Sequence, residues 1–154
     1  MNNIKEYFRT DDIGKLLLVD PRNICEIERA IVSGYIPDIW VVADSPNGEE
    51  AYQYLRSKVH APNFILSQSL FKQLVYRDEV SNAVAAFQIK HKNLDQITLP
   101  DNPLVVVLDG LEKPGNLGAI LRSCDAAGAD AVLVTRPQTD LFNPNLIRAS
   151  LGCF

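Results

Sequence analysis

The chain has 154 residues, of which 47% are hydrophobic and 22% are charged, and its formal net charge is −4. This balance is typical of a globular protein with one domain or two small ones, and it excludes an intrinsically disordered chain. The sequence has neither the about 18 consecutive apolar residues of a membrane-spanning helix nor a secretory signal, so we expect a cytoplasmic protein without a membrane partner.

The first part of the chain alternates strand patterns with helix patterns. A short apolar run predicts a strand over residues 16–19. Apolar residues at helical spacing predict a helix over residues 24–31, and Gly34 is expected to end it. A second apolar run predicts a strand over residues 39–43.

The same alternation continues along the chain. A helix is predicted over residues 49–58 and a strand over residues 63–66, after which Ser67 or Ser69 is expected to cap another helix. Residues 83–87 predict a fourth strand. Strands that alternate with helices indicate an α/β sandwich.

A polar segment rich in Pro and Asn separates this part from the rest of the chain. We therefore expect a first domain over residues 1–97, a linker over residues 98–103 and a second domain over residues 104–154. The second domain begins with a continuous apolar run, residues 104–108. Such a run is typical of a strand that is covered on both faces of a parallel sheet.

A βαβ unit is predicted from this strand onward. The loop over residues 109–115 leads to a helix over residues 116–127, which Gly128 is expected to end. Residues 131–134 predict the next strand, parallel to the first. Pro144 is suited to the first turn of a second helix.

The loop before the first of these helices lies where ligands usually bind in parallel sheets, at the carboxyl end of a strand. Its sequence runs into the helix as Glu112-Lys113-Pro114-Gly115-Asn116-Leu117-Gly118-Ala119-Ile120-Leu121-Arg122. It contains neither the pattern of a P-loop nor the GxGxxG of a dinucleotide site. Gly115 and Gly118 allow a tight turn and a close approach of another backbone. Composition and spacing alone indicate only a polar loop before a helix.

This segment resembles the first motif of the SpoU/TrmH methyltransferases of the SPOUT superfamily. That motif has an Asn, then Gly-Ala-Ile, then an Arg six residues after the Asn, here Asn116, residues 118–120 and Arg122. The start of the family's second motif is similar to residues 143–152, which include Arg148 and Ser150. Because both motifs occur in the right order and spacing, the resemblance is specific.

The resemblance extends to the first part of the chain, over residues 27–36 and 74–78. This part is similar to the family's substrate-binding domain, a small α/β sandwich related to ribosomal RNA-binding proteins. One departure is visible, because the family commonly has Val-Glu-Gly where this chain has Val19-Asp20-Pro21. The fold implied is this sandwich followed by the first part of a parallel-sheet α/β knot domain.

The resemblance implies transfer of a methyl group from S-adenosylmethionine to a ribose 2′-hydroxyl of RNA. The N-terminal domain favours 23S-type ribosomal RNA as substrate. The methyl group is already electrophilic, so catalysis must place the hydroxyl in line and assist loss of its proton.

The family's motif-one arginine, here Arg122, belongs to the active site. A guanidinium stays protonated, so we expect Arg122 to hold the target phosphate and stabilise the developing alkoxide. A purely structural alternative pairs it with Asp125 on the same helix.

Asn116 is the second candidate catalytic residue. It could orient Arg122 or the substrate ribose, or it could cap the helix. The candidate substrate-binding residues are Glu112, Lys113, Arg148 and Ser150. For the first two the structural alternative is an ordinary polar loop, and for the last two it is a capped, solvent-facing helix.

Phe154 falls within the second motif, and the family's third motif has no counterpart in the sequence. The resemblance implies that the knot and most cofactor-binding positions are missing. We therefore expect an inactive fragment that binds S-adenosylmethionine weakly or not at all. Family members act as dimers, so a homodimer is expected for the full-length parent.

The charges do not form a general RNA-binding surface. The first 100 residues have 11 Lys/Arg and 13 Asp/Glu, and residues 101–154 have 4 and 6. RNA binding would therefore depend on shape or on a local patch such as residues 90–92, which a solvated strand end explains equally well. Three separated cysteines and two histidines indicate neither disulfides nor a metal site, so no metal cofactor is expected.

Two other classes of function are compatible with the sequence. A non-catalytic RNA-binding or ribosome-associated module would use the N-terminal domain alone. A small-molecule-binding α/β protein with a glycine loop would not bind RNA. Salt-sensitive binding of ribosomal RNA would exclude this last class.

Overall fold

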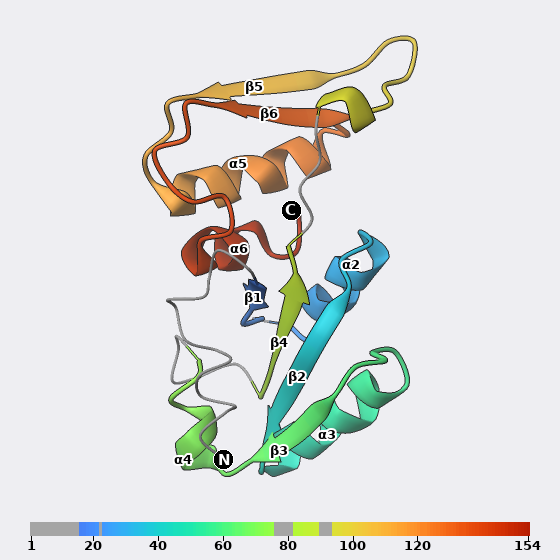
Figure 1. The fold of residues 1–154 in the computed structure, drawn as a ribbon, viewed down its shortest axis with the longest axis vertical. Coiled ribbons are helices and arrows are strands. Elements are labelled where there is room, and N and C mark those ends of the chain that lie inside the picture. Colours follow the sequence, from blue (N-terminus) through green and yellow to red (C-terminus); the bar gives the residue numbers. More distant parts are fainter. Residues whose placement is uncertain (1–15, 22, 76–81, 90–93) are drawn as a thin grey trace. The chain divides into compact units, whose positions relative to one another are not determined.

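The computed structural model describes residues 16–21, 23–75, 82–89 and 94–154. The chain divides into two compact units, residues 1–89 and residues 90–154, and each has its own sheet (Figure 1). The basic residues 90–92 lie outside the described part. No helix in the described ranges is both long and apolar enough to cross a membrane.

The sheet of the N-terminal unit has the strand order β1-β4-β2-β3. Its strands are β1 (Leu16–Val19), β2 (Pro37–Ala43), β3 (Asn63–Leu66) and β4 (Ala83–Gln88). Strand β4 is antiparallel to β1 and β2, whereas β3 is parallel to β2. All four predicted strands are confirmed, with ends that differ by two residues at most.

The two central strands, β2 and β4, provide most of the core of this unit (Figure 1). Consecutive residues are buried in both strands, over residues 39–43 and 83–87. Burial on both faces explains why these strands are continuous apolar runs rather than alternating patterns. Trp40 and Phe87 are the largest side chains that are fully buried.

The described residues of this unit form the helices α2 (Cys25–Val32), α3 (Pro46–Arg56) and α4 (Gln68–Phe71). The predicted start of α3 at residue 49 is wrong by three residues. Ser45 caps the helix by accepting a hydrogen bond from Gly48 N at 3.0 Å, and Pro46 fits the first turn. Residues 46–48 have no apolar periodicity, so the sequence pattern indicated a helix only from residue 49 onward. Ser67 rather than Ser69 precedes α4, but its side chain makes no capping hydrogen bond.

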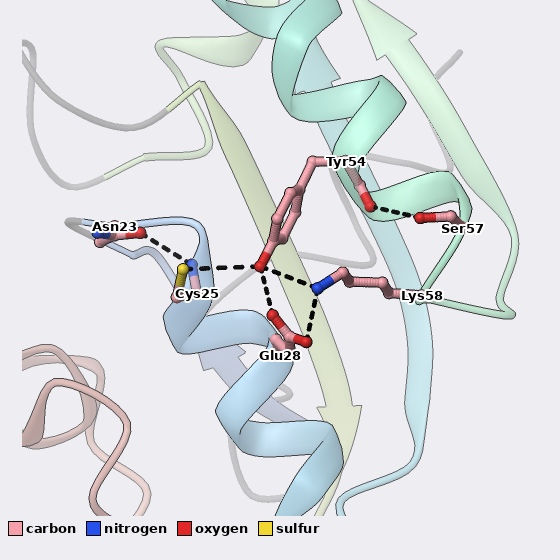
Figure 2. Close-up of polar contacts among 6 residues, drawn as sticks. All are labelled: Asn23, Cys25, Glu28, Tyr54, Ser57 and Lys58. Atoms are coloured by element: carbon pink, nitrogen blue, oxygen red, sulfur yellow. Dashed lines mark hydrogen bonds and ion pairs between the residues drawn. The ribbon is translucent and has the colours of Figure 1, made fainter.

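A polar cluster joins α2 to α3 (Figure 2). The Glu28 carboxylate of α2 accepts hydrogen bonds from the hydroxyl of Tyr54 and from Lys58 Nζ, the latter at 2.7 Å. Cys25 Sγ lies 3.6 Å from the same hydroxyl. Bonds from Lys58 and Tyr54 lower the pKa of Glu28, while the bond to Glu28 raises the pKa of both partners. The cluster therefore connects two helices about 30 residues apart in sequence.

The C-terminal unit is built on a parallel pair of strands (Figure 1). Its elements are η2 (Leu94–Gln96), β5 (Val105–Asp109), α5 (Pro114–Ala126), β6 (Ala131–Thr135) and α6 (Pro144–Ser150). The predicted βαβ unit and the second helix are confirmed. Gly128 follows α5 with a φ of 69°, the left-handed conformation expected of a helix-ending glycine.

Two expectations for this unit are wrong. Helix α5 begins at Pro114 rather than at residue 116, because proline fits the first helical position. Strand β5 is not covered on both faces, since Val107 is 59% exposed and Leu104, just before the strand, is 47% exposed. The apolar run indicated a strand with other elements packed on both faces. The described helices leave part of the apolar surface of β5 exposed.

Candidate functional site

Strands β5 and β6 end side by side, with Asp109 opposite Thr135 in the register. The β5–α5 loop, residues 110–113, and the β6–α6 loop, residues 136–143, both start from these ends. We call this border of the sheet the carboxyl edge. It is the position at which open parallel sheets usually bind ligands.

A group of three polar side chains lies at the carboxyl edge. The Asp109 carboxylate accepts hydrogen bonds from Thr135 Oγ1 at 2.6 Å and from Arg136 Nε at 2.9 Å. Arg136 Nη2 donates to the second carboxylate oxygen, so the contact is bidentate. Arg136 and, secondly, Thr135 lower the pKa of Asp109. Sequence analysis missed this group, because no spacing rule connects an Asp with an Arg 27 residues later.

The two loops are also joined through their backbones. Gly110 N donates to Thr135 O at 3.0 Å, and Gln138 N donates to Leu111 O at 3.3 Å. The Gln138 side chain donates to Arg136 O at 3.1 Å. Hydrogen bonding between the two segments thus continues beyond the ends of the strands and connects the starts of the two loops.

Arg122 lies on α5 with an exposed side chain. Within the described part of the chain it makes no hydrogen bond or ion pair, so the structural alternative of a bond to Asp125 is wrong. Asp125 instead accepts a hydrogen bond from Cys153 Sγ at 3.4 Å. The guanidinium of Arg122 keeps all of its donors available for a ligand.

Asn116 is exposed in the first turn of α5. The residue that precedes the helix is Lys113, without a side-chain capping bond, so the alternative that Asn116 caps the helix is wrong. Asn116 lies three residues inside the helix because Pro114 begins it. Residues six apart are not neighbours on a helix surface, and no hydrogen bond in the described part joins Asn116 to Arg122. A direct orienting contact between them is therefore absent from this structure.

The residues of the second motif form α6. Asn143 caps this helix by accepting a hydrogen bond from Asn145 N at 2.9 Å, and Arg148 Nη2 donates to Asn145 Oδ1 at 2.7 Å. Ser150 is fully buried, and its hydroxyl donates to Ile147 O at 2.6 Å. The helix is capped as expected, but it is not solvent-facing at Ser150, whose side chain is buried.

Gly118 explains why this end of α6 is buried. A Cβ atom at Gly118 would lie 2.6 Å from Leu146 O and 2.9 Å from Ser150 N. Only glycine allows α5 and α6 to approach so closely, which confirms the expected close approach of a backbone. The absence of a side chain at Gly118 in the first motif thus allows the helix of the second motif to pack against α5.

Glu112 and Lys113, the remaining candidates, are exposed in the β5–α5 loop. The structure therefore brings Glu112, Lys113 and Asn116 together at the start of α5, while Arg122 lies two turns further along. No group of three His, Cys, Asp or Glu residues able to hold a metal ion occurs in the part that was described.

Residues 103–154 match the SpoU rRNA methylase family. The C-terminal unit belongs to this family. The chain is 40% identical over 80 residues to the 23S rRNA (guanosine-2′-O-)-methyltransferase RlmB of Haemophilus influenzae, a match that covers 49% of this chain and 32% of RlmB. It is 30% identical over 135 residues to a TrmH family tRNA/rRNA methyltransferase of Staphylococcus saprophyticus, which covers 82% of this chain and 53% of that protein.

The fold is also that of solved SpoU methyltransferases. The structure of AviRb from Streptomyces viridochromogenes superposes with a TM-score of 0.85 at 22% identity, over 99% of this chain and 60% of AviRb. At this identity the likeness shows a mixed α/β fold with parallel strands. The chain spans about a third to a half of the two curated relatives described above. The family predicted from the two motifs is confirmed.

Proposed function

We propose that this chain is part of an enzyme that transfers a methyl group from S-adenosylmethionine to a ribose 2′-hydroxyl of ribosomal RNA. The observation that carries the proposal is Arg122, an exposed guanidinium without a partner in the described structure, within the segment that matches the family. The names of the relatives support it, since RlmB is a 23S rRNA 2′-O-methyltransferase. One superposed structure, AviRb, is a complex with the cofactor AdoMet.

S-adenosylmethionine supplies an electrophilic methyl group when it is bound, and we assign none of the described residues to it. Arg122 is assigned to the substrate. Its planar, permanently charged guanidinium can bind two oxygens at once, which suits the target phosphate and the alkoxide that forms as the hydroxyl loses its proton. Stabilisation of developing charge by a fixed donor is a large term in enzyme catalysis.

The other candidates are assigned to binding of RNA. Asn116 at the start of α5 is assigned to orientation of the ribose, without touching Arg122. Glu112, Lys113 and Arg148 are assigned to contacts with the RNA, whereas Ser150 acts through the packing of α6 because its side chain is buried. In this proposal no metal takes part.

The N-terminal unit is proposed to be the ribosomal-protein-like domain that binds the RNA substrate. Its mixed sheet with helices α2 and α3 has the α/β organisation expected of such a domain. The proposal includes a homodimer in the cytoplasm, where ribosomal RNA is present.

The test is methyl transfer by the gene product that contains these 154 residues. Ribosomal RNA and transfer RNA are incubated with S-adenosylmethionine that carries a tritiated methyl group, and the product RNA is hydrolysed with alkali. Because a 2′-O-methyl group blocks this cleavage, label in alkali-resistant dinucleotides from ribosomal RNA is the expected result. Label in single nucleotides would show base methylation and contradict the proposal. RNA binding without any label would favour the non-catalytic module.

A further inference from the structure

The backbone of Arg136 has an unusual conformation. Its φ is 47°, in the left-handed region that residues other than Gly, Asn and Asp rarely adopt. The residue comes directly after β6, where the chain turns into the β6–α6 loop. Such conformations persist only where surrounding contacts enforce them, and they are concentrated at functional sites.

The Arg136 side chain makes a bidentate contact with Asp109, named here the Asp109–Arg136 pair. The Arg136 side chain is 76% exposed and the Asp109 side chain is 48% exposed. Exposed ion pairs contribute little to the stability of a fold, so stability is a weak reason for this arrangement. The pair does, however, connect the start of one loop to the start of the other.

The β5–α5 loop follows Asp109 directly and carries Glu112 and Lys113. Two backbone hydrogen bonds join it to the neighbouring segment. Gly110 N donates to Thr135 O, and Leu111 O accepts from Gln138 N. The Gln138 side chain in turn bonds the carbonyl oxygen of Arg136. Gln138 thus bonds both Arg136 and Leu111. The conformation of Arg136 therefore influences the position of Gln138 and, through its bond to Leu111, the path of the loop.

We propose that the Asp109–Arg136 pair positions the β5–α5 loop for RNA binding, an inference that rests on the proposed function. Neither side chain has to touch RNA. A loop held in its bound conformation before the RNA arrives loses less conformational entropy on binding. Loss of the pair therefore weakens RNA binding more than it slows the methyl-transfer step.

Two single variants and their combination test the proposal in the full chain. Arg136→Gly removes the pair but suits the left-handed backbone, so the variant is expected to keep the fold. Asp109→Asn removes the pair while it changes the net charge in the opposite direction. Binding of a 23S ribosomal RNA transcript is measured by filter binding, and thermal unfolding by circular dichroism.

Both single variants are expected to bind the transcript roughly tenfold more weakly, and the double variant no more weakly than either, as expected for contacting residues. In the methyl-transfer assay the KM for RNA rises by a larger factor than kcat falls. Direct contact of Arg136 with phosphate predicts instead that Asp109→Asn binds equally well or more tightly, and this result would overturn the proposal.

The outcomes also separate this inference from the proposed function. If the parent chain binds ribosomal RNA in a salt-sensitive manner and both variants bind equally well, only the role of the pair is wrong. If the parent chain shows no such binding, the proposed function fails and the inference fails with it.

Discussion

The two units use the same alternation of strands and helices but differ in where their apolar residues lie. In the N-terminal unit, β2 and β4 are buried on both faces, and a polar cluster joins α2 to α3. In the C-terminal unit, Val107 of β5 is exposed, and Asp109, Thr135 and Arg136 form a polar group at the carboxyl edge of the strands. The N-terminal sheet is therefore buried within its unit, whereas the C-terminal sheet keeps apolar and polar side chains exposed.

The largest expected effect concerns the core of the N-terminal unit. Leu55 is fully buried, so Leu55→Ala is expected to lower the free energy of unfolding by about 2–5 kcal/mol, from lost transfer energy and the cavity left behind. Val107→Ala in the C-terminal unit is the matched control, with an expected change within about 0.5 kcal/mol. Urea unfolding followed by circular dichroism measures both. Equal losses would contradict the contrast in burial.

The next effect concerns chemistry in the C-terminal unit. In the gene product that contains these 154 residues, Arg122→Lys keeps the charge but loses the planar pair of donors, so methyl transfer is expected to fall by roughly 100-fold or more, as when one fixed donor is removed from an oxyanion site. Arg56→Lys, an exposed residue of α3, should stay within about twofold of the parent. Tritium transfer to ribosomal RNA gives both rates. Equal turnover by Arg122→Lys and the parent would rule out two-point binding by the guanidinium.

Substitutions of two glycines in α5, Gly118 and Gly115, distinguish the effect of helix packing from the effect of helix propensity. Gly118→Ala forces α5 and α6 apart and should cost about 1–3 kcal/mol of stability, the usual cost of overpacking. A Cβ atom at Gly115 meets nothing within 4 Å, so Gly115→Ala should be neutral or stabilise by up to about 1 kcal/mol. Thermal unfolding distinguishes them. Equal unfolding midpoints of the two variants would contradict the close packing of α5 against α6 at Gly118.

The smallest effect is the pH dependence of the cluster between α2 and α3. The pKa of Glu28 is lowered, first by Lys58, so its stabilisation is present above its ordinary pKa of 4.5 and is lost as pH falls through the lower folded value. The pKa of Tyr54 is raised from 10.0 and that of Lys58 from 10.5, so their contributions are lost as pH rises through the raised values.

The cluster should therefore stabilise the protein most between about pH 5 and pH 10. Since Glu28 and Lys58 are exposed, the effect is expected to be small. Unfolding midpoints across this range and below it compare the parent with Glu28→Gln, which should lose the part of the acidic limb that lies below pH 4.5. An identical acidic limb in both proteins would assign the pH dependence to other carboxylates.

The sequence by itself determined the elements and the family. Apolar runs and helical spacing depend on residues close together in the chain, and they located the strands of both units and the helices α2, α5 and α6. The motif from Asn116 to Arg122 is contiguous, so its resemblance to the family needed no structure. The start of α3 was missed because Ser45 and Pro46 act through hydrogen-bond geometry rather than hydrophobicity.

Tertiary structure alone decided which groups meet at the carboxyl edge. Asp109 and Arg136 are 27 residues apart, and only the parallel register of β5 and β6 brings them into contact. Burial of Ser150 likewise depends on the close approach of another helix at Gly118. Contacts of this kind arise from the packing of distant segments, whose free energy is not encoded in any local pattern of residues.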